Sequence, residues 1–142
     1  MKGLVDRRHR VLRVRHAQHA MSVAETVRAQ DEAATIAHNA ERLRRVRADL
    51  FRNEGMANGA SFAAMQELAG RLEQAGRQLD GALYDANRRV EQKKDLSMIA
   101  SREREIAARL KDRAHAQLEE WRENRLAALP RYRRMQRTGD GG

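Results

Sequence analysis

A hydrophobic heptad repeat runs without interruption from residue 62 to residue 90. Apolar or small residues recur at alternating spacings of three and four, at Phe62, Met65, Ala69, Leu72, Gly76, Leu79, Leu83, Ala86 and Val90. This spacing keeps one narrow stripe on one side of a helix, and it is typical of a helix that supercoils left-handedly around a partner helix. We call such a stripe of contacting positions the seam. The repeat predicts a helix over residues 61–137.

A second apolar-periodic stretch lies upstream and predicts a first helix over residues 4–52. We assign its seam to Leu12, Ala20, Val23, Val27 and Ala34, followed by Ile36, Ala40, Leu43, Val46 and Leu50. Alanine and valine dominate these positions, so each layer buries little apolar area. Because apolar burial stabilises by roughly 25 cal/mol per Å², such layers give weak support compared with leucine layers. The pattern predicts marginal stability for the isolated chain.

The segment between the two stretches contains the residues of a turn. Asn53–Ala60 includes Gly55 and the pair Asn58-Gly59, which tolerate backbone conformations that other residues avoid. Two long helices joined by a short turn form an antiparallel hairpin. The predicted fold is therefore all-α, a long antiparallel two-helix coiled-coil hairpin. We expect one domain over residues 1–142, with a turn at 53–60 and a disordered basic, glycine-containing tail at 138–142.

Beyond Val90 the heptad is broken by Lys93 and Ser97. We expect the apolar stripe to resume in a shifted position, at Leu96, Ile99, Ile106, Leu110, Ala114, Leu118 and Trp121. Such a shift is a stutter, which locally unwinds a supercoil. A turn centred near residue 57 would place residue 4 opposite residue 110. The second helix is then expected to overhang the first from residue 111 onward.

The composition supports a helical protein without a wide core. Ala, Glu, Lys, Leu and Arg supply 78 of the 142 residues, which is typical of coiled coils. Charged residues reach 35% and aromatic residues only 4%, and the single proline argues against a disordered chain. The chain has no cysteine, which excludes disulfides, and no apolar run long enough to span a membrane. A cytoplasmic location is the default expectation.

Positive charge is concentrated near the two ends of the chain. Residues 1–16 contain six basic and one acidic side chain, and residues 121–138 contain six arginines and one glutamate, so each segment carries a net charge of +5. The formal net charge of the chain is +9. A hairpin would bring both segments to one basic pole. Such a pole is compatible with a solvated face, an acidic partner surface or nucleic acid, and less so with membrane headgroups.

Residue types that carry catalysis or bind metals do not form a recognisable constellation. His16 and His19 lie three residues apart near His9, but no carboxylate or thiolate completes a ligand set and arginines flank them. The acidic pair Glu119 and Glu120 has no predicted cleft that would perturb a pKa. The glycines of the turn lack the Lys-Ser/Thr of a phosphate-binding loop. We therefore predict no enzymatic site, no metal and no cofactor.

Several strings resemble the FliJ family of flagellar export proteins and its YscO-type injectisome relatives. The similarity extends over nearly the whole chain and includes the basic start and the turn Met56-Ala-Asn-Gly-Ala-Ser61. Its most specific part is Met65-Gln-Glu-Leu-Ala-Gly-Arg-Leu72, and Arg88-Arg-Val-Glu-Gln-Lys-Lys94 and Leu118-Glu-Glu-Trp-Arg-Glu-Asn-Arg125 resemble the charged carboxyl half. The sequence departs from the family where aromatic residues follow the turn, because Met65 and Leu68 stand there.

The resemblance implies a non-enzymatic stalk and escort protein of a flagellar or type III export apparatus. Such proteins engage a hexameric export ATPase and a membrane export gate, and they assist the delivery of substrates and chaperones. The ATPase ring would grip the basic pole through Arg7, Arg8, Arg10, Arg13, Arg122, Arg125, Arg133 and Arg134. Leu68 and Leu72 would contact the gate, which implies peripheral association with the inner membrane. The alternatives are a basic coiled-coil module that binds nucleic acid or another polyanion, and a plain structural spacer.

Overall fold

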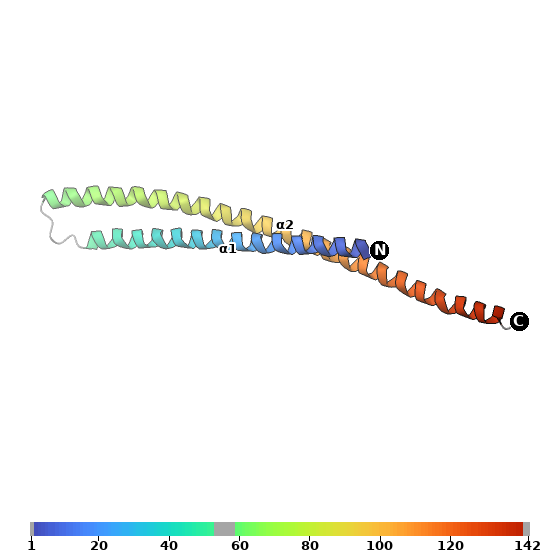
Figure 1. The fold of residues 1–142 in the computed structure, drawn as a ribbon. Coiled ribbons are helices and arrows are strands. Elements are labelled where there is room, and N and C mark those ends of the chain that lie inside the picture. Colours follow the sequence, from blue (N-terminus) through green and yellow to red (C-terminus); the bar gives the residue numbers. More distant parts are fainter. Residues whose placement is uncertain (1, 53–58, 141–142) are drawn as a thin grey trace. The chain divides into compact units, whose positions relative to one another are not determined.

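The described part of the chain consists of two α-helices. The computed structural model describes residues 2–52 and 59–140, and it describes side-chain surroundings for all of these except 51 and 130–140. Helix α1 spans Lys2–Arg52 and helix α2 spans Gly59–Asp140, and this part of the chain contains no strand (Figure 1). The predicted all-α class is confirmed.

The observed helix bounds differ slightly from the predicted ones. Both helices begin two residues earlier than expected, at Lys2 and Gly59, and α2 extends to Asp140. Residues 138–140, which the sequence analysis assigns to a disordered tail, are therefore helical, because the arginine, methionine and glutamine residues before them favour continuation of the helix. Most of the predicted turn, residues 53–58, and the final residues 141–142 lie outside the described part of the chain.

The helices pack in two units. The central unit comprises Met21–Ser97, and the terminal unit comprises Met1–Ala20 together with Met98–Gly142. In each unit a segment of α1 packs against a segment of α2. The expectation of one domain over 1–142 stays a prediction.

Ion pairs between the helices establish their antiparallel direction in the central unit. Glu25 pairs with Lys93 at 3.2 Å, Glu32 with Arg89 at 3.2 Å, and Arg44 with Asp80 at 3.4 Å. Later positions of α1 thus face earlier positions of α2. This arrangement confirms the predicted two-helix hairpin. All six side chains are substantially exposed, so each pair adds at most about 1 kcal/mol of stability.

The core of the central unit is built from small side chains. Ala86 is 1% exposed and packs in a cluster with Ala29, Ala33 and Val90, against which Ile36 lies. Alanine at the contacting positions lets two helices approach closely, but it buries little area in each layer. The cluster therefore depends on close approach of the helices and tolerates no bulky or charged replacement.

The seam of α1 differs from the predicted one in half of its positions. Leu12, Ile36, Ala40, Leu43 and Leu50 are buried or half-buried as predicted. The assignment was wrong for Ala20, Val23, Val27, Ala34 and Val46, which are all exposed. The observed seam keeps strict spacings of three and four by using polar residues, namely Arg15, His19, Ser22, Thr26 and Arg47. The helix therefore keeps one continuous register. This register leaves the valines exposed and places polar side chains at the helix contact.

The seam of α2 continues in one register past Val90, and the predicted stutter was wrong. Lys93, Ser97, Arg104 and Lys111 occupy half-buried seam positions and alternate with alanines. Leu96, Ile99 and Ile106, which the shifted stripe would have buried, are 52%, 49% and 57% exposed. Long basic side chains can occupy such positions because their aliphatic stems pack while their charged ends reach solvent or an acidic partner. Most of the remaining seam predictions on α2 hold, but Phe62 and Trp121 are exposed.

Packing in the terminal unit extends further along α2 than predicted. Ala114 and Leu118 are 4% and 5% exposed, whereas all residues from 119 to 129 are exposed. The segment of α2 without packing therefore begins at residue 119 and not at 111. The reason is the register of the helix pair, in which Arg15 reaches Glu103. The turn position assumed from the sequence would have placed Arg15 opposite a residue closer to the turn.

Candidate partner-binding surfaces

Polar side chains form part of the helix contact in the terminal unit. Nη1 of Arg15 donates to Oε2 of Glu103 at 2.8 Å and to Oε1 of Gln18 at 3.0 Å. One turn along α1, Nδ1 of His19 lies 3.3 Å from Nη1 of Arg104. We call the Arg15–Glu103 and His19–Arg104 contacts, together with the Glu25–Lys93 pair of the central unit, the polar layers. Each connects α1 to α2 and includes a seam position, at Arg15, His19, Arg104 or Lys93, where a coiled coil usually carries an apolar residue.

The arginines at the start of α1 carry unneutralised charge. Arg7, Arg10 and Arg13 are exposed, whereas Arg8 is half-buried at a seam position. Within the described residues none of the four forms an ion pair, although Asp6 stands nearby in the sequence. Their charge is therefore available to a partner. Arg8 differs from the other three because its side chain also contributes to helix packing.

Two of the predicted arginines of α2 contact neighbouring side chains on the same helix. Arg122 pairs with Glu119 at 3.3 Å, and the guanidinium carbon of Arg125 lies 5.2 Å from the ring centroid of Trp121. Both arginines are exposed and belong to the same unit as Arg7 and Arg10. Arg133 and Arg134 belong to α2, but their side chains lie outside the described surroundings. Among the described side chains of the candidate site, the arginines without an ion pair or a ring contact are therefore those of α1.

The two leucines assigned to a gate contact differ in their surroundings. Leu68 is 46% exposed and lies outside the seam, as expected from the heptad. Leu72 is half-buried at the seam and lines a shallow hollow together with Leu43 and Gly76. Leu68 is thus accessible to a partner, whereas Leu72 supports the packing of the two helices.

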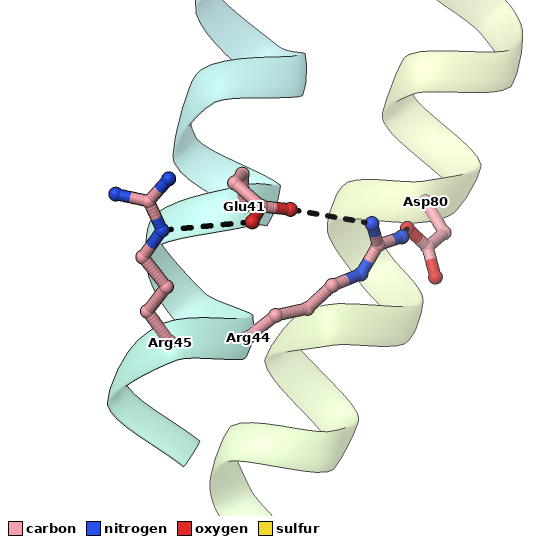
Figure 2. A network of polar contacts seen from close by, with 4 residues as sticks. All are labelled: Glu41, Arg44, Arg45 and Asp80. Atoms are coloured by element: carbon pink, nitrogen blue, oxygen red, sulfur yellow. Dashed lines mark hydrogen bonds and ion pairs between the residues drawn. The ribbon is translucent and has the colours of Figure 1, made fainter. Parts of the chain in front are cut away.

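A charged network spans the helices beside this hollow. Figure 2 shows Glu41 of α1 placed between Arg44 and Arg45, at 3.7 and 3.6 Å, while Arg44 also reaches Asp80 of α2. On the same surface Glu73 of α2 pairs with Arg77 at 3.1 Å. Since each of these acids has a basic partner, this surface presents little uncompensated charge, in contrast to the start of α1.

Groups arranged to hold a metal ion and stretches that could span a membrane are not found in the described part of the molecule. Within residues 2–52 and 59–140, no group of three His, Cys, Asp or Glu side chains is arranged to hold a metal ion. Neither helix, as far as it is described, contains an apolar stretch that could cross a membrane. Of the three histidines that the sequence analysis considers, His19 contacts Arg104 across the helix pair.

Sequence reasoning missed an exposed apolar surface in the terminal unit. Val11 and Val14 of α1 are 40% and 54% exposed, and Ile99 and Ile106 of α2 are 49% and 57% exposed. The spacing of these residues in the sequence is that of a helix surface, since the isoleucines lie seven residues apart and the valines three apart. We had assigned the isoleucines to a displaced seam between α1 and α2. The sequence analysis assigns the two valines neither to the seam nor to a binding surface.

Comparisons with protein-family models, with characterised proteins and with solved structures each gave no match.

Proposed function

We propose that this protein is a non-enzymatic stalk and escort of a flagellar or related type III export apparatus. The observation that best supports the proposal is the combination of an antiparallel helix pair with exposed, unpaired arginines at the start of α1. Such an arrangement suits a helical element that is gripped at a basic end by an acidic surface. The residues that resemble the FliJ family direct the proposal to an export ATPase.

In this proposal Arg7, Arg10 and Arg13 bind acidic side chains of the hexameric ATPase. Exposed like charges on one helix attract an oppositely charged surface over several ångströms, which accelerates encounter and orients the partner. The export gate would contact Leu68, and export chaperones would bind elsewhere along the helices. Contact with the gate would hold the protein at the inner membrane as a peripheral component.

Charge reversal on α1 tests the ATPase contact. We expect the triple variant Arg7→Glu/Arg10→Glu/Arg13→Glu to lose more than about tenfold in affinity for the hexameric export ATPase, because each attraction becomes a repulsion. Stimulation of ATP hydrolysis should be lost in parallel. Affinity is measured at about 150 mM salt, where screening extends over roughly 8 Å. Arg8 is retained because its side chain is half-buried.

The matched control is Arg28→Glu/Arg42→Glu/Arg88→Glu, which changes the net charge by the same amount. These three arginines are exposed in the central unit, and none forms an ion pair with another described residue. The control should retain binding. Equal losses in the two variants would show that only net charge matters, and the ATPase assignment would then fail.

Nucleic acid is the second candidate partner, favoured by the same unpaired arginines. Each arginine that contacts a phosphate releases counterions, so nucleic-acid affinity should fall steeply as salt rises. Wild-type protein that binds a DNA or RNA duplex at about 150 mM salt, and does not bind the ATPase, would favour this candidate. A structural spacer would bind neither.

Substitution of the two leucines separates a gate contact from helix packing. We expect Leu68→Ala to leave the melting temperature nearly unchanged but to weaken gate binding and motility, because exposed Leu68 contributes little to packing. Leu72→Ala should destabilise the protein by about 1–2 kcal/mol, since a half-buried leucine is lost from the seam. Binding and thermal unfolding are measured on the same samples. A Leu68→Ala protein that unfolds, or that binds the gate normally, would rule out the gate contact.

A further inference from the structure

The terminal unit carries an apolar face outside the seam. We define the apolar face as Val11 and Val14 of α1 with Ile99, Ile106 and Leu110 of α2. Four of these side chains are 40–57% exposed, and Leu110 is half-buried. Along each helix the positions follow spacings of three, four or seven, which is the spacing of a second heptad stripe. A stripe of this kind is the surface that a helix presents to a partner helix.

A polar contact shows that the two halves of the apolar face lie on the same side of the helix pair. Glu103 stands between Ile99 and Ile106 along α2, and Arg15 directly follows Val14 on α1. Oε2 of Glu103 accepts a hydrogen bond from Nη1 of Arg15 at 2.8 Å. Arg15 and Gln18 also line a surface hollow of α1 together with Val11 and Val14. The valines of α1 and the isoleucines of α2 therefore flank one polar contact on the same side of the helix pair, and we call the surface along this contact the trough.

The borders of the trough are basic. Arg7 and Arg10 line the hollow on the α1 side. On α2, Arg102 and Arg109 each follow an isoleucine by three residues, and Arg113 follows Leu110 by three residues. All five are exposed, and none forms an ion pair with another described residue. The one acid at the centre of the face, Glu103, is already neutralised by Arg15. An occupant of the trough would therefore meet apolar side chains in the middle and uncompensated positive charge along both edges.

We propose that the apolar face binds an amphipathic helix of another protein, with a leucine-type apolar stripe and glutamates or aspartates along its edges. The helix would lie along the trough as a third helix and complete a small bundle. This inference goes beyond the export function, since it holds for whichever apparatus the protein serves. It identifies the occupant by its chemistry alone.

Charge argues against a second copy of this chain as the occupant. A second copy would bring its own Arg7, Arg10 and Arg109 against the same residues of the first, and like charges across an interface oppose association. Nucleic acid would satisfy the arginines but would leave the valines and isoleucines without contact. An acidic amphipathic helix satisfies both parts of the surface.

A labelled synthetic peptide tests the proposal with the full-length protein. The probe is a peptide of about four heptads with leucine at the a and d positions and glutamate at the e and g positions, whose like charges keep it from pairing with itself. Fluorescence anisotropy should show binding in the micromolar range at about 150 mM salt. A scrambled peptide of the same composition, and a version with lysine in place of glutamate, should both bind at least about tenfold more weakly.

Variants on and off the apolar face locate the binding surface. Val14→Gln/Ile106→Gln should weaken peptide binding about tenfold or more, because apolar contact area is lost from the centre of the trough. The matched control is Val27→Gln/Met98→Gln, which alters two exposed apolar residues outside the face, 47% and 55% exposed. Both double variants should keep wild-type helicity by circular dichroism, since all four side chains are substantially exposed.

Three outcomes would overturn the proposal. The first is peptide binding no tighter than that of the scrambled or lysine versions. The second is an equal effect of the two double variants. The third is a wild-type dimer in sedimentation that Val14→Gln/Ile106→Gln dissociates, which would show that a second copy covers the face. None of these measurements involves the export ATPase, so their failure and the failure of the proposed function are distinguishable.

Discussion

Glutamate in place of Ala33 should unfold the protein, whereas glutamate in place of its neighbour Ala34 should leave it folded. Ala33 is 7% exposed and packs in the alanine cluster with Ala29 and Ala86, where the helices approach closely. A longer charged side chain there must separate the helices or lose its hydration. A buried charge without a partner costs roughly 3 kcal/mol or more, a large share of the stability of a small domain.

Thermal unfolding followed by circular dichroism measures this difference directly. Ala34 is exposed, so its glutamate remains in water, and the two variants have the same composition and net charge. The pair also discriminates between the two seams, because our sequence analysis placed Ala34 at the contact. If Ala34→Glu unfolds the protein and Ala33→Glu does not, the helix pair uses the predicted register and the observed one is wrong.

Leucine at two polar seam positions should stabilise the protein considerably. Ser22 of α1 and Ser97 of α2 are half-buried in the central unit and contribute little apolar area. The double variant Ser22→Leu/Ser97→Leu adds two apolar side chains to the seam. Partial burial of both should stabilise by roughly 2 kcal/mol. The direction of this effect is opposite to that of most substitutions, which destabilise.

The control places leucine at two exposed positions of the same helices, Ala24→Leu/Gln92→Leu. These substitutions raise the apolar content without adding to the seam, so the melting temperature should change little. Chemical denaturation gives the free energy of unfolding for each variant. A stutter near Ser97 would turn that position away from α1, and the seam variant would then be no more stable than the control.

The sequence was sufficient to predict the two helices and their antiparallel pairing. Between Met65 and Val90 every predicted seam position is buried or half-buried. The prediction succeeded because apolar residues and the three-four spacing coincide along this stretch. The helix ends were less accurate, since no proline or strong capping residue defines the start at Lys2 or the end at Asp140.

The prediction failed where the seam is polar. Lys93, Ser97 and Arg104 keep the heptad register but would not be recognised as contact residues by hydrophobicity. The apolar residues nearby, Ile99 and Ile106, belong to a different face. A single sequence cannot distinguish the seam between its own helices from a surface for another molecule, because both have the same period. The pairing of Arg15 with Glu103 and of Lys93 with Glu25 resolves the ambiguity in the structure.

The candidate site was predicted in part. Exposed Leu68 could be placed outside the seam from the heptad alone, whereas the exposure of Arg7, Arg10 and Arg13 is shown by the structure. The half-buried position of Arg8 could not be predicted, because the heptad of α1 was followed from Leu12 onward and not back toward the start of the helix. The local engagement of Arg125 by Trp121 also depends on side-chain geometry that the sequence does not specify.

The polar layers also constrain how the two helices can slide along each other. Alanine-rich contacts repeat every seven residues and would be nearly equivalent after a shift of one heptad. Such a shift in one direction would move Arg15 from Glu103 to Leu110 and leave both charges without a partner. Charged contacts at the seam thus penalise a slipped alignment of this kind, at some cost in stability. A helix pair that transmits axial force between two partners requires this resistance to slippage more than it requires a high melting temperature.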